Sequence, residues 1–582
     1  MQTTKSVTNS INQQSSPATR GGTQSPLRSI ARAFLPSAAA ILTLLLSGVS
    51  SLAGSATWKA SPVSGDWFTV TNWTPATVPN GPADTATFAS SIRTRPFIAF
   101  DAEVSGIVFN SGANAFTIEN APGTSPTLTI SGAGITNNSG ILQNFAFELA
   151  GAQILFLNNA TAGSLTAFTT TNMTFGGAST ADHATFTNNG NVTFANAATA
   201  GDATFTNNAV LLFLDDSTAG NGTFTNSGAG FINFRTGTPT AGNGTFMNPG
   251  GTVSGAGGGL IVFNAGTGGD ATFINNGGAV SGALVGETLF NDTGDAGNAT
   301  LISNGSPGGG EGGLIQFASS STGGTAQIQV SGNGSLDISG HNAPGLTTGS
   351  VEGDGLVFLG ARKLTVGANN LSTTFSGVIQ NGGSSGGTGG SLAKTGTGTL
   401  TLSGANTYTG STTVSAGTLL VSNGTGSGTG TGAVNVNAGT LGGRGIISGP
   451  LTIGTGNGPG ATLAPAGGTT RQATLTSLST LAFNADATYN YTLKAKANRS
   501  RADKVVAMGV TINSGATFAF QANVQGTLQA GLVLTVIDNS SASPINGTFG
   551  NLPDGAVLTA SGNNFQASYE GGDGNDLTLT VQ

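Results

Sequence analysis

Phenylalanine recurs at a fixed interval through the middle of the sequence. One series steps by 19 residues, through Phe156, Phe175, Phe194 and Phe213. A second series has the same step, through Phe186, Phe205 and Phe224. Both continue at longer steps, the first through Phe234, Phe263, Phe290 and Phe317 and the second through Phe246, Phe273, Leu301 and Ile328. A period of this length indicates a solenoid, in which each repeat forms one coil and stacks on its neighbours.

Each repeat contains short strands separated by tight turns. A turn such as Thr199-Ala200-Gly201-Asp202 precedes a strand such as 203–207, and the steps of 27 to 29 residues contain Gly-rich inserts such as 255–259. A solenoid tolerates inserts that are confined to one place per repeat. A coil of two or three strands cannot bury its own inward face. We therefore expect each Phe to lie over the Phe one coil earlier, at the strand spacing of roughly 4.8 Å.

Polar residues flank the second Phe series at constant offsets. Asn recurs two residues after it, at Asn188, Asn207, Asn226, Asn248 and Asn275, which predicts a ladder of stacked amides. Asp202, Asn221, Asn243 and Asp270 recur three residues before it, where a turn needs a side chain that caps its own backbone. A calcium-binding row of the Asp members is the alternative. Half of the positions before the Phe series are neutral Asn, and this favours a ladder over a calcium-binding row.

The composition excludes several classes of protein. Of 582 residues 96 are Gly, 37% are hydrophobic and only 7% are charged, which fits neither ordinary disorder nor the three-residue period of collagen. The absence of Cys excludes disulfides and thiolate metal sites. A net charge of −7 argues against nucleic acid as a partner. We expect an all-β chain without a cofactor.

The N-terminal part divides into two segments. Residues 1–56 combine a basic stretch, the apolar run 38–46 and a small-residue exit, which is typical of a secretory signal peptide. Residues 57–103 contain every Trp of the chain, at Trp58, Trp67 and Trp73. We interpret this segment as an N-terminal cap over the first coil, since terminal repeats are atypical. A carbohydrate-stacking face is the alternative.

After the repeats of 104–391, residues 392–421 carry a more specific pattern of Lys, Gly and Leu positions. Its defining residues are Lys394, Gly396, Gly398, Leu400, Leu402, Gly404, Asn406, Tyr408, Gly410 and Gly417. The segment closely resembles the autotransporter-associated β-strand repeat, also called the passenger-associated transport repeat. The resemblance extends over a repeat region at 392–469 and returns near the end of a β-strand-rich segment, 470–582, at 568–579.

The resemblance implies a right-handed parallel β-helix exported to the bacterial surface. There it implies a structural, adhesin-like or matrix role without catalysis, in an extracytoplasmic, secreted or outer-surface location. A carbohydrate-binding or polysaccharide-degrading β-helix is the alternative. The residues after the motif do not have the long alternating strands of a translocator. A separate outer-membrane exporter is therefore one expected partner, and a surface polysaccharide or cell-envelope component is another.

Few residues offer reactive chemistry. Residues 571–579 match one calcium-binding nonapeptide, in which Asp573 and Asp576 would be the ligands, but the motif occurs once and favours a simple turn. Strand alternation would place Asp215 and Asp216 on opposite faces. The two histidines, His183 and His341, lie several coils apart. A basic cluster, formed by Lys494, Lys496, Arg499, Arg501 and Lys504, is interpreted as a solvated turn, with attraction to an acidic surface polymer as the alternative.

Overall fold

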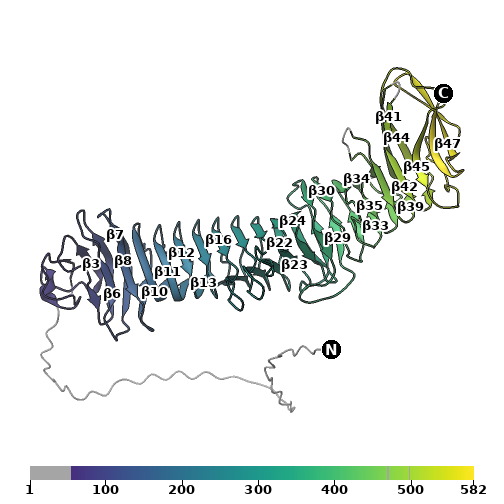
Figure 1. Ribbon diagram of the computed structural model, residues 1–582. Coiled ribbons are helices and arrows are strands. Elements are labelled where there is room, and N and C mark those ends of the chain that lie inside the picture. Colours follow the sequence, from purple (N-terminus) through teal and green to yellow (C-terminus); the bar gives the residue numbers. More distant parts are fainter. Residues whose placement is uncertain (1–53, 468–470, 497–498) are drawn as a thin grey trace, which may run out of the picture. The chain divides into compact units, whose positions relative to one another are not determined.

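The computed structural model describes residues 54–467, 471–496 and 499–582. Nearly all of the predicted signal peptide therefore lies outside the described residues. Within these ranges the chain forms β-strands and one short 3-10 helix, η1 (Val70–Asn72). The all-β parallel β-helix is confirmed (Figure 1). No helix in the described ranges is long and apolar enough to span a membrane.

Each coil contributes one segment to each of three parallel ladders. Residues 185–188 of β11 (Thr185–Phe194) pair with β10 (Thr166–Phe175) before them and β12 (Thr204–Asn207) after them; we call this ladder face A. Residues 191–194 pair with β10 and with β13 (Val210–Asp215), on face B. Face C follows, where Thr199 bridges Thr180 and Thr218. The coil is thus three-sided, and its third side is a single bridge in the 19-residue repeats.

The ladders run through most of the described chain. Besides parts of β10, β11 and β12, face A comprises β4 (Phe97–Ile98), β6 (Thr117–Asn120), β8 (Gln143–Phe147), β14 (Thr223–Asn226), β16 (Thr245–Asn248), β18 (Thr272–Asn275), β20 (Thr300–Ser303), β22 (Gly323–Val330), part of β24 (Gly345–Gly353), β27 (Thr373–Phe375), β30 (Thr399–Leu402), β32 (Thr418–Val421), β34 (Gly439–Gly443), β37 (Ala461–Ala464), β40 (Ala487–Lys496) and β44 (Thr517–Gln525). Face B comprises parts of β5 (Ala102–Phe109) and β7 (Thr127–Asn137), then β9 (Gln153–Phe156), β13, β15 (Phe231–Gly237), β17 (Leu260–Phe263), β19 (Glu287–Phe290), β21 (Leu314–Phe317), β23 (Ser335–Asp337), β25 (Leu356–Phe358) and β28 (Val378–Gln380).

Face C widens into full strands at both ends. At the N-terminal end it comprises β1 (Ala56–Trp58), with β2 (Trp73–Thr74) antiparallel beside it, then β3 (Gly81–Phe88), residues 106–109 of β5 and residues 134–137 of β7. After the Thr bridges it comprises part of β24, β26 (Lys363–Val366), β29 (Ser391–Lys394), β31 (Thr412–Val414), β33 (Val434–Val436), β36 (Leu451–Ile453), β39 (Leu481–Phe483) and β43 (Val510–Ile512). Faces A and C therefore continue past residues 391 and 469, where the sequence predicts domain boundaries.

The interior is built from stacked aromatic rings. Phe205 stacks on Phe186 at 4.4 Å and on Phe224 at 5.1 Å between ring centroids, and it meets Phe194 of face B edge-on at 5.9 Å. All four rings are fully buried. The register is Phe on Phe because the step of 19 residues is the length of one coil. Aromatic pairs of this kind each contribute about 0.5–1.5 kcal/mol beyond the area they bury.

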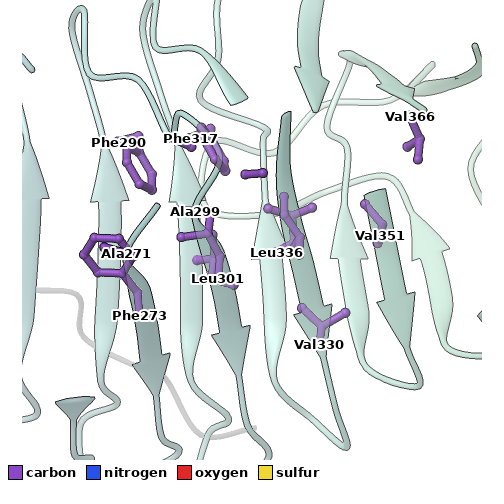
Figure 2. Close-up of a cluster of buried hydrophobic side chains, with 14 of the residues drawn as sticks. Ala271, Phe273, Phe290, Ala299, Leu301, Phe317, Val330, Leu336, Val351 and Val366 are labelled. Atoms are coloured by element: carbon purple, nitrogen blue, oxygen red, sulfur yellow. The ribbon is translucent and has the colours of Figure 1, made fainter. Parts of the chain in front are cut away.

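The aromatic columns give way to aliphatic side chains in the later coils (Figure 2). On face A, Phe273 pairs with Leu301, Leu301 pairs with Ile328, and Ile328 pairs with Val351. On face B, Phe290 still stacks on Phe317 at 4.9 Å. The core remains closed through this change, because these aliphatic side chains are also buried.

The three Trp residues form the first layer of the core. Trp73 packs edge-on against both Trp58 and Trp67 at 5.0 Å, and all three are at most 1% exposed. Each indole N–H donates to a backbone carbonyl: that of Trp58 to Arg93, that of Trp67 to Pro79 and that of Trp73 to Trp67. Side chains buried in this way cannot stack on a sugar. The carbohydrate-stacking alternative for these residues is therefore wrong.

The C-terminal residues add a second sheet. It comprises, in spatial order, β35 (Ile446–Ile447), β38 (Thr474–Ser477), β42 (Lys504–Ala507), β45 (Val533–Asn539), β48 (Asp576–Val581), β47 (Asn563–Gly571) and β46 (Val557–Ala560). The first four strands are parallel and the last pairings are antiparallel. A further strand, β41 (Arg499–Ala502), pairs antiparallel with the end of β40.

Candidate functional site

The predicted Asn positions form a continuous chain of amide hydrogen bonds inside the helix. Asn188 Nδ2 donates to Asn207 Oδ1 at 2.6 Å, and Asn207 Nδ2 donates to Asn226 Oδ1 at 2.8 Å. The chain continues to Asn248 and Asn275 at 3.1 and 2.7 Å. Every member is fully buried, and each of the first four also donates to a backbone carbonyl of a later strand. These amides join coils and present no surface to a ligand.

The positions before the second Phe series have a different role from the predicted one. Asn221 Nδ2 donates to Asp202 Oδ1 at 2.9 Å, and Asn243 Nδ2 donates to Asn221 Oδ1 at 3.1 Å, so they form a second ladder at the surface. The turn is capped instead by Thr199 and its equivalents, whose hydroxyl accepts the N–H of Gly201 at 3.0 Å. Thr218, Thr240 and Thr267 repeat this contact. A Thr recurs in the sequence three residues before each of these Asp and Asn positions, and this repeat could have identified the capping residue.

Lys394 is the most unusual residue of the specific repeat, because its ammonium is buried inside the coil. The side chain lies on β29 and is 1% exposed. Its Nζ donates to the carbonyls of Thr395 and Gly396 at 2.5 and 3.0 Å and to Ala416 of the next coil at 3.4 Å. Burial lowers the pKa of this ammonium. Lys394 therefore closes its own turn and ties it to the following one.

The glycines of the repeat make room for these contacts. A Cβ on Gly417, whose φ is +65°, would lie 2.8 Å from Lys394 Nζ and 2.4 Å from the Gly396 carbonyl oxygen. A Cβ on Gly396, Gly398, Gly404 or Gly410 would likewise lie 1.8–2.4 Å from a backbone oxygen of the preceding coil. Backbones that approach this closely exclude any side chain.

Asn406 and Tyr408 extend the same linkage across face B. Asn406 Oδ1 accepts the N–H of Ile379 at 2.8 Å, and its Nδ2 donates to the Gly428 carbonyl at 2.6 Å, so one amide spans three coils. The Tyr408 hydroxyl lies 2.5 Å from that of Thr412, and burial raises the Tyr408 pKa. Leu400 and Leu402 are buried in the core. The polar residues of the repeat are thus engaged within the solenoid.

Replacing Lys394 with Met should destabilise these coils. The three carbonyl oxygens stay in place and lose a charged donor, so we expect a loss of about 1.5–3 kcal/mol in the free energy of unfolding. Lys363→Met is the matched control, because Lys363 is exposed on β26, the strand that pairs with β29. Denaturant unfolding of the two variants measures the difference. Equal midpoints would show that the buried ammonium has no stabilising role.

Of the candidate calcium ligands near the C-terminus, Asp573 lies on the turn between β47 and β48, and Asp576 is the first residue of β48. Asp576 is buried and its Oδ1 accepts the N–H of Asn539 at 2.9 Å, whereas Asp573 is exposed. Burial raises the pKa of the Asp576 carboxyl, and nearby Asp538 and Asp573 act in the same direction. In the described ranges, no group of three or more His, Asp or Glu side chains could hold a metal ion.

The candidate catalytic residues are dispersed. Asp215 leaves the strand with a φ of +57°, so alternation ends there and both Asp215 and Asp216 are exposed. They accept hydrogen bonds from the Asn196 N–H and the Thr238 hydroxyl. His183 Nδ1 lies 2.6 Å from an Asp182 carboxylate oxygen, a hydrogen bond that raises the His183 pKa. His341 is buried, and its Nε2 lies 2.7 Å from the Ser321 carbonyl oxygen.

The comparisons with known proteins identify one segment of the chain. Residues 392–421 match the family described as Passenger-associated-transport-repeat, so the resemblance of this segment is confirmed. No curated protein matches the chain. Among solved structures, the Haemophilus influenzae Hap adhesin matches with 11% sequence identity and a TM-score of 0.25, over 86% of this chain and 63% of that chain. The match spans less than two thirds of the Hap chain.

Proposed function

We propose that this protein is a secreted or cell-surface bacterial β-solenoid with a structural, adhesin-like or matrix role and no catalytic activity. The observation that carries the proposal is the passenger-associated-transport repeat at 392–421, whose polar residues Lys394 and Asn406 bind backbone groups of adjacent coils. A repeat that makes this kind of contact stabilises a stack of coils. Lys394 and Asn406 are buried and are therefore not available to a substrate.

The arrangement of the acidic residues supports a scaffold over an enzyme. A glycosidase needs two carboxyl groups about 5–9.5 Å apart on either side of the scissile bond. Asp215 instead accepts the Asn196 N–H of the preceding coil, and Asp216 accepts the Thr238 hydroxyl of the following coil. The alternative function is a carbohydrate-binding or polysaccharide-degrading β-helix. A cationic surface near the C-terminus supports carbohydrate binding but not polysaccharide degradation.

Coil-by-coil folding suits an exported chain. Each coil pairs in parallel with the one before it, so a chain that emerges unfolded can add coils to a finished template. The absence of Cys removes the risk of premature disulfides. A separate outer-membrane exporter and a surface polysaccharide or envelope component are the partners we propose. Nucleic acid is not among them.

Fractionation of the producing cells tests the location. We expect the chain, without its signal peptide, outside the cytoplasm and accessible to added protease. Leu44→Arg with Leu45→Arg should hold it in the cytoplasm, because two charges interrupt the apolar run that the export machinery recognises. Thr8→Arg with Ser10→Arg adds the same charges to the polar N-terminal stretch and should leave export intact. A cytoplasmic location for the unmodified chain would refute the proposal.

A further inference from the structure

We infer that the C-terminal part of the solenoid binds an acidic, carboxylate-bearing polysaccharide in a basic hollow. The hollow has a volume of about 840 Å³ and is lined by six cationic side chains, those of Arg444, Arg471, Lys494, Lys496, Arg499 and Arg501. This inference rests on the proposed function, since a surface protein meets such polymers. It names the class of ligand that the surface would hold.

The hairpin of β40 and β41 places like charges directly opposite each other. In the antiparallel register, Lys494 pairs with Arg501 and Lys496 pairs with Arg499. All four residues are exposed, and they alternate with less exposed residues that face the other way. Like charges at directly opposed positions destabilise a hairpin. Two such pairs in succession therefore indicate that the surface is arranged for an anion.

The charges of the hairpin remain unneutralised by the protein. Among the described residues, none of these four cations forms an ion pair with a carboxylate. The acidic residue that follows β41, Asp503, is fully buried and accepts hydrogen bonds from Thr492 and Ala473. The prediction of a solvated turn is thus wrong for these residues, because they lie on paired strands.

The fold brings two further arginines to the hairpin from earlier coils. Strands β34, β37 and β40 are consecutive on face A, and β40 continues beyond the end of β37, where β41 takes over its pairing edge. Arg444 follows β34 directly, and Arg471 precedes β38. Both line the hollow together with the cations of the hairpin.

The neighbouring groups favour a sugar polymer over a nucleic acid. Guanidinium groups match carboxylates with two parallel hydrogen bonds, and amides suit hydroxyls. Gln472 lines the hollow, and Asn523 and Gln525 of β44 are exposed beside Lys494 and Lys496. The described lining contains no aromatic ring on which a base could stack.

Binding of sodium alginate, a polyuronate, to the full chain tests the inference, with neutral dextran as the comparison. We expect alginate alone to bind, and more weakly as salt is raised, since mobile ions screen these exposed charges. Lys494→Gln with Arg501→Gln removes one cross-strand pair and should weaken alginate binding at least about tenfold. Arg235→Gln with Lys363→Gln makes the same change in net charge at exposed sites elsewhere and should bind as the parent does.

A thermal melt separates the site from a folding role. The Lys494 and Arg501 variant should melt at the same temperature as the parent or higher, because it loses a repulsive pair. Equal alginate binding by both variants, equal binding of dextran, or tighter binding of heparin or of a single-stranded oligonucleotide would each overturn the inference. Cell fractionation would still decide the location independently.

Discussion

The variant Phe205→Asp should unfold several coils of the solenoid under conditions in which the parent is fully folded. Phe205 is fully buried and is enclosed by Phe186, Phe224 and Phe194 at centroid distances of 4.4, 5.1 and 5.9 Å. A carboxylate there has no cation to pair with, and an unpaired buried charge costs several kcal/mol. The loss of three ring contacts adds to this cost.

Two further variants isolate the cause. Phe205→Leu keeps an apolar side chain and loses the stacking, so we expect a smaller loss, of about 1–2 kcal/mol. Thr204→Asp places the same charge on the exposed side of the same strand, β12, and should be close to neutral. If Phe205→Asp and Thr204→Asp had the same stability, the buried Phe column would not hold the coils together.

The measurement must detect local unfolding. Stacked repeats contact only their neighbours, so damage in one coil does not have to unfold distant coils. Denaturant unfolding should therefore be combined with limited proteolysis. New cleavage sites are expected near residues 186–224, where the enclosing rings lie.

The spacing of Phe contained most of the information about the fold. A constant step of 19 residues fixes both the length of the coil and its register, and the structure pairs Phe186 with Phe205 and Phe205 with Phe224. The spacing does not show which polar residue caps a turn. Thr199 and Asp202 recur with the same period, but only the three-sided path places the Thr199 hydroxyl at the Gly201 N–H.

The basic hollow could not be predicted in full from the sequence. The four cations of the hairpin lie within eight residues, and their closeness is visible in the sequence. Arg444 lies 50 residues before Lys494, and the intervening coils differ in length. Only the pairing of β34 with β37 and of β37 with β40 shows that the strand before Arg444 and the strand that carries Lys494 belong to one ladder. A variable insert length removes the periodicity from which such a contact could be inferred.

Alkaline pH should destabilise the C-terminal half of the protein strongly, because burial raises the pKa of all four tyrosines. The pKa of Tyr569 rises to about 12, and those of Tyr408, Tyr489 and Tyr491 rise further above the usual value. Above about pH 10 the unfolded chain loses phenol protons that the folded chain keeps. Stability is then fully present below pH 10 and falls as the pH rises, by up to about 1.4 kcal/mol per pH unit for each tyrosine.

Lys394 has the opposite effect on stability as the pH rises, and it acts over a lower pH range. Burial lowers its pKa, so the folded chain loses this proton first, and stability rises as the pH approaches the usual lysine value of 10.5. Above that value the ammonium is deprotonated in both states and its contribution to the slope ends. Of these groups, only the tyrosines determine the slope of stability against pH above about pH 10.5, and there stability falls as the pH rises.

Tyr491→Phe is the sharpest test of this alkaline transition. Among the described residues the Tyr491 hydroxyl has no hydrogen-bond partner, so its removal should not lower stability near pH 8 and should make the alkaline slope shallower by about 1.4 kcal/mol per pH unit. Tyr569→Phe is the matched control. It loses hydrogen bonds with the Phe549 N–H and the Leu552 carbonyl, so it should lower stability near pH 8 while also reducing the slope. Denaturant unfolding from about pH 8 to about pH 11.5, followed by tyrosinate absorbance, measures both effects. An unchanged slope in Tyr491→Phe would show that this phenol already titrates in the folded state, and hence that it is reached by water.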